Sequence, residues 1–111
     1  MARESAGCLQ GALDLLVLRT LERCGRMHGY AITLHIQSRS EDVLRIEEGS
    51  LYPALHRMEQ AGWIKADWSA TENNRRARYY TITAAGRKQL AAEQDKWMTV
   101  AGAVARFLEY A

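Results

Sequence analysis

The chain has 111 residues, of which 48% are hydrophobic and 25% charged, so one folded domain with a real core is expected and bulk disorder is excluded. Its net charge of +2 does not by itself indicate a nucleic-acid binder, so any basic surface must be local. Cys8 and Cys24 are too few for a secreted disulfide scaffold, which favours a reduced, cytoplasmic protein in which both are small buried hydrophobic residues.

The first predicted element is a helix that begins near Leu9, after a loose start at residues 1–8. Its apolar residues are too continuous for a single face, so we expect burial on several sides, by its own core or by a partner chain. The run LDLLVLRTL carries two charges and is shorter than the ~20 residues of a membrane span, so no membrane segment is expected. Gly25 ends this helix.

Two more helices are predicted, over residues 28–40 and from Ser50 to Gly62, joined by a connector at residues 41–48. The first has an apolar stripe that consists of Tyr30, Ala31 and Leu34, widened by Ile32 and Ile36. In the second, apolar residues recur with helical spacing at Leu51, Ala54, Leu55 and Met58. If Ser50 caps this helix, Pro53 lies in the first turn, where a missing N–H costs nothing because these amides have no acceptor inside the helix.

A hairpin is predicted next in the chain. Residues 63–70 and 77–83 are rich in aromatic and β-branched residues, which is typical of strands. The polar sequence TENNRR between them predicts a turn, and Asn73 and Asn74 suit a turn with positive φ. Three helices followed by a two-stranded wing indicate a winged helix-turn-helix.

The last predicted helix is capped by Thr83 and runs to about Glu109, with apolar residues seven apart in two rows, as in a helix–helix seam. These rows could pack on the first helix of the same chain, but that helix is apolar on more than one side, so exchange between two chains is favoured. We expect a homodimer interface that includes Leu13, Leu16, Leu90, Trp97, Val100, Val104 and Phe107. The expected fold is therefore mainly α (α+β), with a winged helix-turn-helix domain over residues 1–83 and a C-terminal dimerisation helix over residues 84–111.

Two surfaces are candidates for binding DNA. The second helix of a helix-turn-helix enters the major groove, and its outward residues here are Ser50, Tyr52, Pro53, His56 and Arg57. Over residues 71–88, five basic residues against one acidic residue give a net charge of +4, and the wing offers Asn73, Asn74, Arg75, Arg76 and Arg78. The alternative for the helix is a surface helix of a small bundle, since Glu47 and Glu48 before it and Glu59 on it oppose the approach of phosphate. The alternative for the wing is a solvated charged turn.

No enzymatic or metal site is predicted. His28 and His35 lie seven residues apart, but no cysteine or carboxylate completes a metal-binding set with them. The sequence has no glycine-rich phosphate loop, no nucleophile elbow and no HExxH motif. We therefore expect neither a cofactor nor an enzymatic activity.

Four segments resemble the short form of the PadR family of bacterial transcriptional regulators: GALDLLVLRTL (11–21), MHGYAI (27–32), EEGSLYPALHRMEQAGWI (47–64) and NNRRARYYTITAAGRKQL (73–90). The resemblance implies a winged helix, a dimerisation helix and operator binding, usually as a repressor. It implies DNA contacts by Tyr52 and by Arg75, Arg76 and Arg78. It also implies a phenolic or other aromatic effector near the dimer interface, for which Trp97 is the matching residue.

Two other functions stay open at this stage. One is a winged-helix module for protein–protein assembly without DNA binding. The low net charge favours it, as do Glu47 and Glu48 beside the second helix of the helix-turn-helix, here called the reading helix. The other is a dimer that sequesters a planar aromatic ligand.

Overall fold

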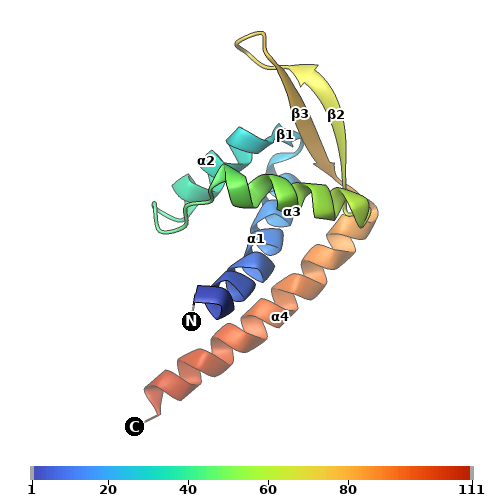
Figure 1. Cartoon of the computed structure of the whole chain (residues 1–111). Coiled ribbons are helices and arrows are strands. Elements are labelled where there is room, and N and C mark those ends of the chain that lie inside the picture. The colour runs from blue at the N-terminus through green and yellow to red at the C-terminus, as the bar shows by residue number, and fades with distance from the viewer. Residues whose placement is uncertain (1, 111) are drawn as a thin grey trace.

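The computed structural model describes the backbone of residues 2–110 and the side chains from residue 12 to residue 110. The elements are α1 (Ala2–Cys24), β1 (Met27–His28), α2 (Gly29–Arg39), α3 (Glu48–Gln60), β2 (Ile64–Ala70), β3 (Arg76–Ile82) and α4 (Ala84–Glu109). Figure 1 shows α1 behind α3, the sheet projecting beyond the helices, and α4 running along one side. The winged helix-turn-helix expected from the sequence is confirmed.

One hydrophobic core joins the first three helices to the base of the sheet. Its fully buried side chains include Leu18, Leu21, Ile32, Leu51, Leu55, Met58 and Ile64. Helix α1 packs against α2, α3 and α4, which explains why its apolar residues are not confined to one face. The core therefore fixes α3 and the sheet relative to one another.

The ends of α1 differ partly from expectation. The expected loose start is wrong, because the helix already begins at Ala2. Gly25 ends it as predicted, in a positive-φ conformation and with its amide donating to the carbonyl of Leu21 at 2.9 Å. Cys24 is exposed rather than buried, because it lies in the last turn of the helix, where α1 leaves the core. The side chain of Cys8 lies outside the described residues.

The buried face of α2 also differs from the predicted stripe. His28 caps the helix by accepting a hydrogen bond from the amide of Ala31 at 3.2 Å. The residues that face the core are Gly29, Ile32 and Ile36. Tyr30 and Leu34 are 57% and 47% exposed, so the prediction that they form the buried stripe is wrong. Both residues instead line the groove described below.

Helix α3 begins one turn earlier than predicted. The amides of Ser50 and Leu51 both donate to the carbonyl of Glu47 at 3.0 Å, and Glu47 is the N-cap, without a side-chain hydrogen bond. Pro53 therefore lies inside the helix and not in its first turn, and it supplies no N–H for the carbonyl of Gly49. Gly49 and Pro53 are both exposed, so water can donate a hydrogen bond to that carbonyl. The predicted buried face of Leu51, Ala54, Leu55 and Met58 is confirmed.

The sheet has three antiparallel strands in the order β1–β3–β2, so the expected two-stranded wing gains a short third strand. The hairpin pairs Ile64 with Ile82 and Trp68 with Arg78. Because side chains alternate along a strand, these four residues lie on one face. At the base this face is buried in the core, whereas farther out Trp68 is 58% exposed.

Thr83 caps α4 as predicted, because its hydroxyl oxygen accepts a hydrogen bond from the amide of Gly86 at 3.0 Å. A side chain at Gly86 could not fit, since a Cβ atom there would lie 2.1 Å from the carbonyl oxygen of Trp63. The first part of α4 packs on α1, and the helix then runs past α1 to the C-terminus (Figure 1). Its exposed apolar residues are Trp97, Met98, Val100, Val104, Phe107 and Leu108.

Candidate nucleic-acid interface

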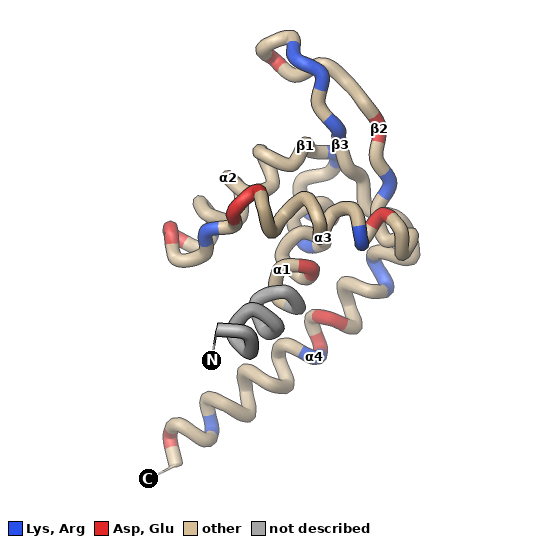
Figure 2. Tube along the Cα trace, viewed as in Figure 1, with Lys and Arg blue, Asp and Glu red and all other residues tan. Residues whose placement is uncertain are grey.

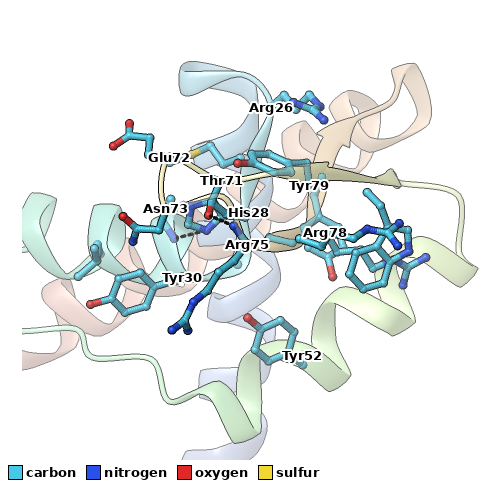
Figure 3. Close-up of a pocket in the computed structure, with 18 of the residues that line it drawn as sticks. Arg26, His28, Tyr30, Tyr52, Thr71, Glu72, Asn73, Arg75, Arg78 and Tyr79 are labelled. Carbon is cyan, nitrogen blue, oxygen red and sulfur yellow. Dashed lines mark hydrogen bonds between the residues drawn. The ribbon is translucent and has the colours of Figure 1, made fainter.

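A groove of about 990 Å³ lies between α2, α3 and the β2–β3 hairpin. Its lining includes Tyr30 from α2, Tyr52 and His56 from α3, and Trp68, Arg75 and Arg76 from the hairpin. Figure 3 shows Arg75 reaching from the hairpin toward the space between Tyr30 and Tyr52. The groove thus combines aromatic surface with hydrogen-bond donors, both of which suit contact with nucleic acid.

Tyr52 forms the floor of this groove beside the start of α2. A Cβ atom at position 29 would lie 2.8 Å from the Tyr52 hydroxyl, so the glycine found there leaves room for the ring. Burial, with a smaller contribution from the Glu48 carboxylate, raises the pKa of Tyr52. The phenol therefore stays protonated at neutral pH and keeps its O–H as a donor.

Other predicted residues of α3 divide into two groups. Ser50, Pro53 and His56 are exposed, as expected for a helix that meets a partner, and only His56 of the three lines the groove. Arg57 does not line the groove. Its guanidinium donates two hydrogen bonds, at 2.7 and 2.8 Å, to the carboxylate of Asp14 on α1.

The Asp14–Arg57 pair is structural in character. The side chain of Asp14 is 10% exposed and that of Arg57 is 42% exposed. The hydrogen bonds to Asp14 raise the pKa of Arg57 despite some desolvation, so the guanidinium is held in its charged form. Arg57 is thus engaged in an ion pair within the chain and lies outside the groove. Sequence periodicity placed it on the outer face of α3 but did not reveal that α1 supplies a carboxylate there.

The turn of the hairpin positions Arg75. The amide of Thr71 donates to the carbonyl of Arg75 at 2.7 Å, and the amide of Asn74 donates to the carbonyl of Thr71 at 2.9 Å. Asn74 has φ of 61°, which confirms the predicted positive φ at this turn. Asn73 lines the groove, whereas Asn74 is exposed outside its lining. A tight turn of this kind holds Arg75 at the rim.

The arginines of β3 have different surroundings. Arg78 forms an ion pair with Glu59 of α3 at 3.0 Å, and its Nε atom is buried without a hydrogen-bond partner. Arg76 is exposed and lies over the ring of Trp68, with 5.2 Å between its guanidinium carbon and the ring centroid. Among the described residues, neither Arg75 nor Arg76 forms an ion pair. Figure 2 shows basic residues gathered on β3 and acidic residues at the start of α3.

The base of the wing is braced from its other face. Arg26 forms an ion pair with Asp67 of β2 and lies over the ring of Tyr79 at 4.2 Å. His28 meets the same ring edge-on, with 5.3 Å between centroids. The hydrogen bond from Arg26 lowers the pKa of Asp67, so this carboxylate is ionised at neutral pH. These contacts connect the hairpin to the segment that leads into α2.

Sequence reasoning missed Trp68, Tyr30 and Arg26 as residues of this region. Trp68 had a usable signal, because the period-two alternation places it on the same face as Arg76 and Arg78 of the paired strand. Tyr30 and Arg26 had none, since their positions depend on how α2 packs. The three histidines do not converge: His28 caps α2, His35 lies 3.6 Å from the Cys24 sulfur, and His56 lines the groove.

Within residues 12–110, no group of three or more metal-binding side chains comes together. None of the helices in the described part of the chain is long and apolar enough to cross a bilayer.

This chain is similar to a known protein family, to a bacterial protein sequence and to solved structures. The profile of the "Transcriptional regulator PadR-like family" matches residues 17–92. An uncharacterized protein of Lysinibacillus sphaericus is 29% identical over 101 residues, 91% of this chain and 92% of that protein.

Two solved structures share both sequence and fold with this chain. A transcriptional regulator from Clostridium thermocellum is 29% identical, with a TM-score of 0.81 over 91% of this chain and 97% of that chain. A PadR family transcription regulator from Clostridium difficile is 30% identical, with a TM-score of 0.70 over 86% of this chain and 97% of that chain. The family is one of transcriptional regulators and not of enzymes, as expected from the sequence. Its profile spans more than half of the sequence, so the chain belongs to the PadR-like family of transcriptional regulators.

Proposed function

We propose that the protein is a homodimeric, sequence-specific DNA-binding regulator that acts in the cytoplasm, represses its target genes and is relieved by a small aromatic effector. Family membership implies DNA-binding regulation, and the finer statements are our proposal. The observation that carries it is the groove between α3 and the hairpin, where Arg75 and Arg76 lie beside exposed aromatic and hydroxyl groups. In this arrangement α3 enters the major groove and the hairpin reaches the neighbouring phosphates.

The proposed contacts follow from exposure and pairing. From α3 they are Ser50, Tyr52, Pro53 and His56, and from the hairpin Asn73, Asn74, Arg75 and Arg76. Arg78 is a weaker candidate for a phosphate contact, because Glu59 of α3 already neutralises part of its charge in an ion pair. It would orient the hairpin on the duplex more than bind a phosphate of its own.

The exposed half of α4 supports the dimer. Trp97, Val100, Val104 and Phe107 are 46–74% exposed in a single chain, and burying such surface is worth ~25 cal/mol per Å². Leu13 and Leu90 are each only 6% exposed, and Leu16 is partly buried against the same core. The proposed interface therefore consists of the exposed rows of α4, and the three leucines support it from within each chain.

The proposed effector site lies on the same exposed part of α4. Trp97 is 46% exposed on α4, so a planar aromatic molecule could stack on its ring where two copies meet. Such compounds should quench the tryptophan fluorescence of the wild-type dimer and should lose this effect in Trp97→Ala. Equal quenching of the variant would place the ligand elsewhere.

A second candidate function is a winged helix used for protein–protein assembly. Glu47 and Glu48 at the start of α3 and Glu59 near its end favour it, because these carboxylates oppose phosphate. It predicts a protein partner that competes for the hairpin and no salt-dependent affinity for DNA. The salt dependence of binding therefore separates the two candidates.

The test is a mobility-shift assay with DNA from upstream of the gene itself. The logarithm of affinity should fall with the logarithm of salt concentration by about 0.9 for each phosphate that is neutralised. Replacing Arg75 and Arg76 together with alanine should flatten this slope by about 1.8 per chain that contacts DNA. Arg39→Ala, on α2 and outside the groove, is the matched control. Absence of binding to any promoter fragment at low salt would exclude the proposed function.

A further inference from the structure

Trp68 is an exposed aromatic residue that the fold alone does not explain. It projects from β2 on the face that is buried at the base of the sheet, yet its own side chain is 58% exposed. It lies beyond the hydrophobic core and is not part of it. Together with the exposed rings of Tyr30 and Tyr52 in the same groove, the indole forms an aromatic patch, and such a patch points to a partner.

Two guanidiniums lie near the indole ring. The guanidinium carbon of Arg76 lies 5.2 Å from the ring centroid and that of Arg78 lies 6.0 Å from it. A guanidinium that stacks on a ring uses its flat face, so its N–H edges stay free for phosphate oxygens. Arg78 is in turn fixed to Glu59 of α3 at 3.0 Å. The indole is thus linked to α3 indirectly, through Arg78 and its ion pair with Glu59.

The position of Trp68 determines which part of a duplex it would meet. The indole lines the same groove as Tyr52 and His56 of α3. With α3 in the major groove and the tip of the hairpin at the next groove, one sugar–phosphate strand must pass between them. That strand presents deoxyribose, which is largely apolar, between two phosphates. An indole beside the guanidinium of Arg76 matches a sugar next to a phosphate.

We propose that Trp68 is a DNA-contacting residue that packs on the deoxyribose of the strand separating the two grooves, while Arg76 binds an adjacent phosphate. The inference rests on the proposed DNA binding and adds a residue that fixes the position of the backbone and not the base sequence. It makes a distinctive claim, because an apolar contact contributes affinity without neutralising a phosphate.

The experiment compares Trp68→Ala, Trp68→Phe and Arg76→Ala by fluorescence anisotropy with labelled duplex at several salt concentrations. Trp68→Ala should weaken binding about tenfold for each half-site, on specific and unrelated duplexes alike, with an unchanged salt slope. Trp68→Phe should recover most of the affinity, because a ring remains. Arg76→Ala should lower the salt slope by about 0.9 for each chain that contacts DNA. Ser69→Ala changes the next residue, on the opposite face of β2, and should have no effect.

The outcomes separate this inference from the proposed function. If Arg75→Ala and Arg76→Ala weaken binding but Trp68→Ala does not, the hairpin binds DNA and our assignment of Trp68 is wrong. A changed salt slope in Trp68→Ala would show that the indole only supports the arginines, and would also overturn it. If all of these variants bind like the wild type, the proposed function itself fails at this groove. An equal loss on single-stranded DNA would indicate stacking on bases and contradict the contact with deoxyribose.

Discussion

Replacing Arg57 with alanine should destabilise the fold and leave the affinity for DNA unchanged. The substitution removes both hydrogen bonds to Asp14 and leaves a carboxylate whose side chain is 10% exposed. Breaking a fully buried pair costs about 3–5 kcal/mol, whereas an exposed pair is worth about 0–1 kcal/mol. Because Arg57 is 42% exposed and solvent screens part of the interaction, we expect a loss of about 2 kcal/mol.

The reverse substitution should cost less. In Asp14→Ala the guanidinium of Arg57 keeps access to water, so we expect a loss of about 1 kcal/mol. The double variant should be less destabilised than the sum of the two, by about 1 kcal/mol, because each single change leaves a charge without its partner. Urea unfolding at one fixed protein concentration gives these values, since the stability of the proposed dimer would depend on concentration. Arg57→Met, which keeps the apolar stem, separates lost packing from lost charge.

DNA binding by the same variants decides what Arg57 does. At a temperature where each variant is folded, Arg57→Ala should bind the operator within about twofold of the wild type, whereas Arg75→Ala should bind more weakly at every sequence. A stability loss below about 0.5 kcal/mol together with a large loss of DNA affinity would refute the reasoning. Arg57 would then be a direct DNA contact whose pairing with Asp14 has no structural weight.

Three further predictions concern other parts of the molecule. Gly86→Ala should cost about 3 kcal/mol or more, because its Cβ would lie 2.1 Å from the Trp63 carbonyl oxygen, whereas Gly49→Ala meets no atom within 4 Å and should not destabilise; thermal unfolding compares them. Phe107→Asp should convert the proposed dimer to a monomer in sedimentation experiments, and a persistent dimer would move the interface away from α4. Asp67 has a lowered pKa when folded, so its ion pair stabilises fully above about pH 4 and less at lower pH. The difference in melting temperature between the wild type and Asp67→Asn should therefore stay constant from about pH 5 to 8 and shrink toward about pH 2.

Local patterns in the sequence were sufficient for much of the fold. Leu51, Leu55 and Met58 predicted the buried face of α3, because burial there follows directly from helical spacing. The hairpin was predicted to within one residue, since its strands alternate and its turn contains Asn74, which tolerates positive φ. Thr83 predicted the start of α4 because its cap is made within three residues. In each case the deciding interaction is local.

Errors arose where a distant element decides the outcome. Ile32 and Ile36 form the buried face of α2 while Tyr30 is exposed, because the core lies on one side only and either face has apolar residues. The start of α3 depends on Glu47, whose carbonyl accepts the first hydrogen bonds without any side-chain signal. Arg57 pairs with a carboxylate 43 residues away, which spacing along the helix cannot reveal. The residues of the candidate site that sequence reasoning missed share this dependence on packing.

Contacts between distant parts of the chain also connect the proposed dimer interface on α4 to α3 and the hairpin, which form the proposed DNA-binding surface. Helix α1 packs along α4 and also holds α3 through the Asp14–Arg57 pair, so a change in the position of α4 must be transmitted to α3 or break contacts in between. At the other end, Gly86 leaves no space between the start of α4 and the carbonyl of Trp63, directly before β2. The reading helix, through α1, and the hairpin, through the contact at Gly86, are therefore both packed against α4. In the proposed dimer, the angle between the two α4 helices alone would set the distance between the two reading helices, and a ligand that changes this angle would change the fit to DNA without touching the groove.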